Sequence, residues 1–138
     1  MQRTFAIIKP DAFAAGYTGR ILQRVQEAGF TIRAMRLVHL TQKEAEGFYD
    51  VHRARPFFGS LTAFMSSGPC VVMALEAPDA IVKWRTLMGA TDPAKADANT
   101  LRKEFGQSIE FNATHGSDAP ETAAYELGYF FRGMEFSR

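Results

Sequence analysis

Three apolar segments and one shorter segment of the chain predict four strands. Residues 3–9 carry four consecutive apolar side chains, a pattern that suits a strand covered on both faces of a sheet. Residues 30–40 and 70–76 form two further apolar segments, and a Ser-Gly-Pro turn at residues 67–69 precedes the second of them. A short fourth strand is expected at residues 112–115.

Helical spacing of apolar residues predicts the elements between these strands. Residues 18–28 form an apolar stripe that ends before Gly29, which is a typical helix stop. Thr41 and Glu44 form a capping-box pattern at the start of a helix that continues to about residue 51. A helix over residues 80–88 has Asp79 at its capping position, and shorter or final helical segments are expected at residues 60–65, 100–105 and 121–131.

The order of these elements predicts an α+β fold. Strand, helix, strand, helices, strand, helix, strand and helix follow one another, as in a ferredoxin-like βαββαβ sandwich. In that fold a four-stranded antiparallel sheet has helices packed on one face, although other α+β arrangements share the same element order. Neither a repeat nor a linker divides the chain, so residues 1–138 are expected to form a single domain.

Composition and charge restrict the class of protein further. The chain has 46% hydrophobic residues, enough for a core without disulfides, and Cys70 is expected to be a small core residue. A net charge of +1 argues against general electrostatic binding to nucleic acid or to an anionic membrane. We see neither a signal peptide nor a segment of the roughly 20 apolar residues that cross a bilayer. A cytoplasmic enzyme or binding protein is therefore expected.

Several motifs of common active sites are absent from the sequence. It contains no Gly-rich loop ending in Gly-Lys-Ser/Thr, no Gly-x-Gly-x-x-Gly and no Gly-x-Ser-x-Gly elbow. It also lacks His-Glu-x-x-His, and three separated histidines with one cysteine make a poor metal site. No protein-ligated metal is expected.

Residues 112–118 (NATHGSD) are the strongest candidate for chemistry. His115 at a strand end would present an imidazole to a cleft, and Gly116 would leave room for an incoming phosphate. Histidine has an ordinary pKa near ~6.5, so its neutral, nucleophilic form is available at cellular pH. The alternative from residue pattern alone is a loop histidine that hydrogen-bonds its neighbours.

Basic residues from separate elements could form an anion site. Each alone is expected to be a solvated charge or a surface ion pair. Together they would suit a polyphosphate, because planar guanidinium groups match phosphate oxygens in pairs. These residues are Lys9, Arg55, Arg85 and Arg102. Phe57 and Phe58 lie beside Pro56 in a break of the pattern, where core packing is expected for at least one of them.

The same residues resemble one family. Residues 112–118 are similar to the active-site motif of the nucleoside diphosphate kinases at Asn, His, Gly, Ser and Asp. The similarity continues in order and at consistent spacing over nearly the whole chain, including a Lys-Pro-Asp turn. The other matching segments are residues 3–11, 48–49, 55–58, 67–69, 88–93 and 100–105.

This resemblance implies a reaction and a set of site residues. His115 would take the terminal phosphate of a nucleoside triphosphate and pass it to a diphosphate, in a ping-pong reaction with broad base specificity. Substrates would include ATP, GTP, ADP, GDP and their deoxy forms, with Phe57 stacking on the base. Lys9, Arg85, Thr91 and Arg102 would bind the phosphates, while Lys9 and Asn112 would also contact the sugar.

The resemblance also implies supporting residues and partners. Tyr49 would lie near His115, and Ser117 with Glu126 would orient its imidazole. A Mg²⁺ ion would be bound mainly through the nucleotide phosphates. A homo-oligomer is expected, with a tetramer favoured for a chain that ends soon after Phe136. Ala119 departs from the second serine of many relatives, without touching these roles.

Two other functions compete with a kinase. A ferredoxin-like module could bind nucleotides or single-stranded nucleic acid without turnover, but it would need a basic stripe that a near-neutral chain does not suggest. A catalytically silent relative would be expected to lack the histidine, lysine or arginines of the site, and all are present. No specific nucleic acid and no membrane are expected as partners.

Overall fold

A computed structural model describes residues 1–133, in which an antiparallel sheet has four strands in the order β2-β3-β1-β4. Central β1 pairs with β3 and β4, and β2 pairs with β3. This order and these directions are those of a ferredoxin-like fold, so the predicted fold class is confirmed. Phe136 lies outside the described residues. The strands are β1 (Gln2–Ile8), β2 (Thr31–Val38), β3 (Cys70–Ala77) and β4 (Thr114–Gly116).

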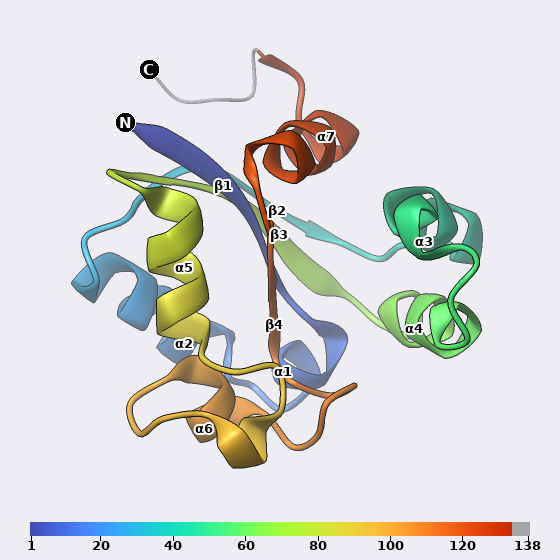
Figure 1. Ribbon diagram of the computed structural model, residues 1–138, viewed down its shortest axis with the longest axis horizontal. Coiled ribbons are helices and arrows are strands. Elements are labelled where there is room, and N and C mark those ends of the chain that lie inside the picture. The colour runs from blue at the N-terminus through green and yellow to red at the C-terminus, as the bar shows by residue number, and fades with distance from the viewer. Residues whose placement is uncertain (134–138) are drawn as a thin grey trace.

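Helices cover both faces of this sheet. Ala6 and Ile8 of β1 face one core layer, while Phe5 and Ile7 face the other, because successive side chains of a strand point to opposite sides. The prediction of helices on one face is therefore wrong, although the apolar character of β1 already suited two covered faces. Figure 1 shows the first layer, α2 (Thr18–Glu27) and α5 (Ala80–Met88), across the sheet from α3 (Gln42–Phe48) and α4 (Phe58–Met65). The final helix, α7 (Pro120–Phe130), packs with the second layer.

Local capping explains where some helices begin. Thr41 accepts a hydrogen bond from the Glu44 amide at 3.1 Å, and the Glu44 carboxylate accepts one from the Thr41 amide at 2.8 Å. The predicted capping box is thus confirmed. Asp79 precedes α5 but has a left-handed backbone and forms no side-chain cap, so that predicted cap is wrong. The sequence pattern also missed the short α1 (Pro10–Ala14), and the remaining elements are η1 (Asp50–His52), η2 (Pro93–Lys95) and α6 (Leu101–Phe105).

Two further expectations concern burial and membranes. Cys70 is fully buried, and burial raises the pKa of its thiol to about 12, so it is the core residue that the sequence predicted. Across residues 1–133, none of the helices has the length and apolar character needed to span a bilayer.

Candidate active site

His115 lies at the end of the sheet in a cage of aromatic rings. In β4 it pairs with Ile7 of β1, which directs its side chain toward the second core layer. The imidazole contacts Phe48, Tyr49 and Phe5 with ring centroids 5.4, 5.9 and 6.2 Å away. Its side chain is still 20% exposed, so the ring is fixed by packing and reachable from one side.

Glu126 fixes the orientation of the His115 imidazole. Its Oε1 lies 3.0 Å from Nε2 of His115 and also accepts a hydrogen bond from the Ser117 hydroxyl at 2.8 Å. Because a carboxylate accepts hydrogen bonds, Nε2 carries the proton and donates, which leaves the free lone pair of the imidazole on Nδ1. The predicted roles of Ser117 and Glu126 agree with this geometry. Glu126 reaches the ring from α7, whose start is fixed by Thr122 accepting from two backbone amides.

Lys9 is a buried ammonium group directly after β1. Its Nζ donates to Asn112 Oδ1 at 2.9 Å and to the Glu110 carbonyl at 3.1 Å. The Asn112 amide in turn donates to the Thr91 carbonyl at 3.1 Å. Three of the predicted ligands, from three different segments, thus form one hydrogen-bonded group.

Burial weakens the proton affinity of Lys9. Burial lowers the pKa of Lys9 to about 8, since desolvation penalises the charged form. The Asp11 carboxylate opposes this effect, the Arg102 guanidinium adds to it, and the Glu110 carboxylate opposes it. Lys9 therefore remains charged at neutral pH but loses its charge at moderately alkaline pH.

Arg102 brings a second cation close to the strand that carries His115. It is largely buried, and its guanidinium donates to the Gly89 carbonyl at 3.1 Å and to the Thr114 carbonyl at 2.9 Å. Burial and the neighbouring Arg85 lower the pKa of Arg102 to about 10, so it stays charged at neutral pH. Thr114 directly precedes His115, which connects this guanidinium to the backbone of the catalytic candidate.

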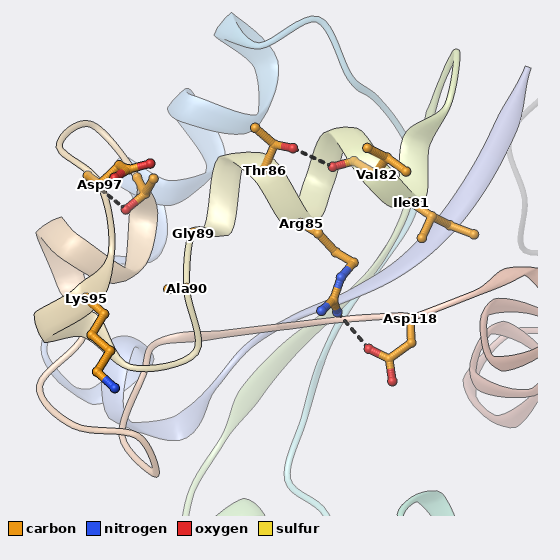
Figure 2. A pocket seen from close by; sticks show the side chains of 10 residues that line it. Ile81, Val82, Arg85, Thr86, Gly89, Ala90, Lys95, Asp97 and Asp118 are labelled. Carbon is orange, nitrogen blue, oxygen red and sulfur yellow. Dashed lines mark hydrogen bonds and ion pairs between the residues drawn. The ribbon is translucent and has the colours of Figure 1, made fainter.

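Arg85 lies on α5 and points toward Asp118, as the dashed line in Figure 2 shows. The two groups form an ion pair of 2.7 Å beside a cavity of about 510 Å³. Both side chains are about half or more exposed, at 47% and 71%, so water screens the pair. An exposed pair contributes at most about 1 kcal/mol. Arg85 is therefore held loosely enough to exchange Asp118 for another anion.

Phe57 presents an aromatic face to a second cavity. Its residue is 47% exposed, and it lines a cavity of about 500 Å³ together with Lys9, Thr91 and Asn112. The His52 ring lies 5.5 Å from Phe57 and 6.4 Å from Tyr49, whose ring contacts His115. Burial, with the nearby charge of Glu126, raises the pKa of Tyr49, so its hydroxyl stays protonated.

The chain is similar to known proteins over nearly its whole length. The family model described as Nucleoside diphosphate kinase matches residues 2–136. The nucleoside diphosphate kinase of Syntrophotalea carbinolica is 64% identical over 135 residues, which cover 98% of each chain. The chain belongs to the nucleoside diphosphate kinase family. The enzyme of that name from Desulfotalea psychrophila is 62% identical, again over 98% of each chain.

Solved structures of nucleoside diphosphate kinases share the fold. That of Aquifex aeolicus superimposes with a TM-score of 0.97 at 45% identity and covers 99% of each chain. The Halobacterium salinarum enzyme, solved in complex with CDP, gives a TM-score of 0.95 at 33% identity over 99% of this chain and 91% of its own. The predictions of family, fold and enzyme class are confirmed, and the chain is a phosphate-transferring kinase of nucleotide metabolism.

The geometry corrects the role predicted for Gly116 in this kinase. Gly116 pairs with Ala6, so it faces the layer of α5 rather than the side of the His115 imidazole. A Cβ atom there would lie 2.4 Å from Cδ1 of Trp84 and 2.7 Å from Cε of Met88. The glycine therefore makes room for the buried indole of α5, and the expectation that it makes room for a phosphate is wrong.

Asp11 is a residue of the kinase site to which the sequence analysis gave no role. Its Oδ2 accepts a hydrogen bond from the Ala113 amide at 3.1 Å. Ala113 has a left-handed backbone, with φ of 73°, directly between Asn112 and Thr114. The Lys-Pro-Asp turn was the feature of the sequence that pointed to Asp11. Its partner Ala113 is about a hundred residues away along the chain, and only the fold brings the two together.

Proposed function

We propose that His115 carries the phosphate in a ping-pong transfer between nucleotides. In the first half-reaction Nδ1 attacks the terminal phosphorus, a P–N bond forms, and the bond from phosphorus to the bridging oxygen breaks. The nucleoside diphosphate leaves with that electron pair. In the second half-reaction an oxygen of another diphosphate attacks the phosphorus, and the P–N bond breaks. The Nε2–Glu126 contact supports this proposal, because it directs the free lone pair to Nδ1.

The cationic residues would stabilise the charge of the transferred group. Phosphoryl transfer needs placement and charge neutralisation, and a site of low dielectric makes fixed charges more effective. We assign phosphate binding to Lys9, Arg85, Arg102 and Thr91, and a sugar contact to Lys9 and Asn112. The arrangement supports this assignment because Lys9 and Arg102 hydrogen-bond to carbonyl and amide oxygens, which leave their positive charge in place.

Phe57 would stack on the nucleotide base. Every base offers a π face, so stacking binds bases without selecting among them, whereas hydrogen-bonded readout would favour one. The exposed ring beside a cavity of about 500 Å³ supports this role and, with it, turnover of ATP, GTP and other nucleotides, including deoxy forms. Nucleoside phosphates as a class are the substrates of the family.

Mg²⁺ would enter bound to the phosphates rather than to the protein. This ion prefers oxygen ligands and is commonly held through substrate phosphates, whose negative charge it helps to neutralise. The side chains of Lys9, Arg85 and Arg102 are cations, which fit the remaining phosphate oxygens and not the metal. The single domain over residues 1–138, the homo-oligomer with a tetramer favoured, and the cytoplasmic location remain predictions.

The test is to incubate the purified protein with γ-labelled ATP and Mg²⁺ and to follow the label. It should attach to the protein, be labile in acid and stable in base, and leave when any nucleoside diphosphate is added. His115→Gln should abolish labelling, and His52→Gln should retain it, since the chain has three histidines and His52 lies beside the same rings.

The outcomes separate the competing functions. Labelling that survives His115→Gln would show that another residue carries the phosphate. Binding of nucleotide to the wild-type protein without any labelling would support a binding module and would refute the transfer mechanism.

A further inference from the structure

Asp11 connects the two segments that carry the site. Its Oδ2 accepts from the Ala113 amide at 3.1 Å, and two residues earlier the Lys9 amide donates to the Ala113 carbonyl at 2.8 Å. Both polar groups of the Ala113 peptide backbone are therefore held by residues 9–11. A left-handed backbone at a residue with a Cβ costs about 1 kcal/mol or more and persists where surrounding contacts hold it.

Holding Ala113 fixes its neighbours on both sides. Asn112, on one side, accepts a hydrogen bond from the Lys9 ammonium group and donates one to the Thr91 carbonyl. Thr114, on the other, pairs with Ile8 and leads to His115. A change of backbone conformation at Ala113 would therefore move the sugar-contacting amide relative to the imidazole.

Asp11 also acts on Lys9 through its charge. Lys9 is 6% exposed, so it has lost most of its water, and its hydrogen-bond acceptors are neutral oxygens of Asn112 and Glu110. The charged groups around it are the carboxylates of Asp11 and Glu110, which favour the ammonium form, and the Arg102 guanidinium, which disfavours it. Oδ1 of Asp11 is itself buried without a hydrogen-bond partner among residues 1–133, so its charge is poorly screened.

We propose that Asp11 is a positioning residue of the kinase, which holds the Ala113 turn by its hydrogen bond and keeps the Lys9 ammonium charged by its carboxylate. Substitutions of Asp11 separate the effect of the hydrogen bond from the effect of the charge. Asp11→Asn keeps an oxygen that accepts from the Ala113 amide but removes the charge. Asp11→Ala removes both.

The direct experiment is an NMR titration of Lys9 in protein labelled with ¹³C-lysine, in which Lys9→Arg identifies the signal among five lysines. The Lys9 midpoint should lie near the pKa of about 8 in the wild type. Loss of a nearby opposite charge should lower it by about one unit in Asp11→Asn. The control is Asp79→Asn, which replaces an exposed aspartate at the start of α5 and should leave the Lys9 midpoint unchanged.

The activity measurement rests on the proposed function. Since the charged lysine is needed, kcat/KM should fall as pH rises through the Lys9 pKa, and this alkaline limb should shift to lower pH in Asp11→Asn. A shift of about one unit from a pKa near 8 gives little change at pH 6 and a loss of about fivefold at pH 8. Asp11→Ala should also lose kcat at pH 6, because the Ala113 turn is released.

An unchanged Lys9 midpoint in Asp11→Asn, or an equal loss of activity at pH 6 and pH 8, would overturn the charge role. Because the NMR titration requires no turnover, its result stands whether or not wild-type protein forms phosphohistidine, and failed labelling would count against the proposed function alone. The hydrogen bond is testable in the wild type, where it should protect the Ala113 amide from hydrogen exchange. Rapid exchange of that amide would overturn the positioning role even if the variants failed to fold.

Discussion

Replacing Gly116 by alanine tests whether the glycine serves the core or the phosphate. The added Cβ would lie 2.4 Å from Cδ1 and 2.7 Å from Nε1 of Trp84, against an ordinary carbon–carbon contact of about 3.5–4.0 Å. Met88 can move its terminal methyl group, but the indole is fully buried and donates to the His115 carbonyl at 3.1 Å. Overpacking a core costs about 1–3 kcal/mol, and losing the indole hydrogen bond about 1 kcal/mol more.

We therefore expect Gly116→Ala to lower the free energy of unfolding by about 2–4 kcal/mol, or Tm by roughly 8–16 °C for a chain of this size. Urea denaturation and calorimetry at a fixed protein concentration measure this, since any assembly would make Tm concentration-dependent. Gly128→Ala is the matched control. A Cβ at Gly128 meets no atom within 4 Å, and alanine inside α7 should stabilise by about 0.5–1 kcal/mol.

Activity separates the two explanations. If the glycine makes room for Trp84, displacement of β4 should lower kcat by about 10–100-fold together with the loss of stability. A Gly116→Ala protein as stable as Gly128→Ala but unable to bind nucleotide would instead restore a phosphate role for the glycine. Wild-type stability and activity in Gly116→Ala would refute the packing argument itself.

Two further predictions concern the base and the imidazole. Phe57→Ala should raise KM for ATP, GTP and CTP by a similar factor, because stacking is worth about 1–3 kcal/mol per base whatever the base is; a loss confined to one nucleotide would contradict stacking. Glu126→Gln should keep the bond from Ser117 but hold the Nε2 proton less firmly, so the rate of His115 phosphorylation in rapid-quench experiments should fall by about 100-fold. An unchanged rate would exclude Glu126 from orienting the ring.

Local patterns predicted the parts of the fold that depend on neighbouring residues. The run of apolar residues in β1 and the Thr41–Glu44 capping box act within a few positions, so both appear in the sequence and in the structure. The helix that follows β1 was missed because the Lys-Pro-Asp run reads equally well as a turn. Proline at the first helical position fits a helix start as well as a strand end, and the sequence alone does not choose between them.

The roles of residues with distant partners were harder to predict from the sequence. The motif around His115 indicated the proposed nucleophile, yet the side of the sheet that each of its residues faces depends on register with β1. A register of Ile7 with His115 puts the imidazole in the second layer and Gly116 under Trp84, whereas a shift by one residue would reverse both. The glycine was therefore assigned to the wrong neighbour although its place in the motif was recognised.

The charge balance of the site follows from which oxygens hold its cations. Had buried carboxylates paired with Lys9 and Arg102, the cluster would be neutral, and a polyphosphate would have to displace them from a medium where ion pairs are strong. Instead, the hydrogen bonds of both groups go to carbonyl and amide oxygens, which satisfy donors without cancelling charge. The carboxylate that pairs with Arg85 is exposed Asp118, where exchange costs little. Asp11 differs from such a paired carboxylate because its hydrogen bond goes to the Ala113 backbone, so the Lys9 donors are left to neutral oxygens while the Asp11 charge favours the ammonium form of the lysine.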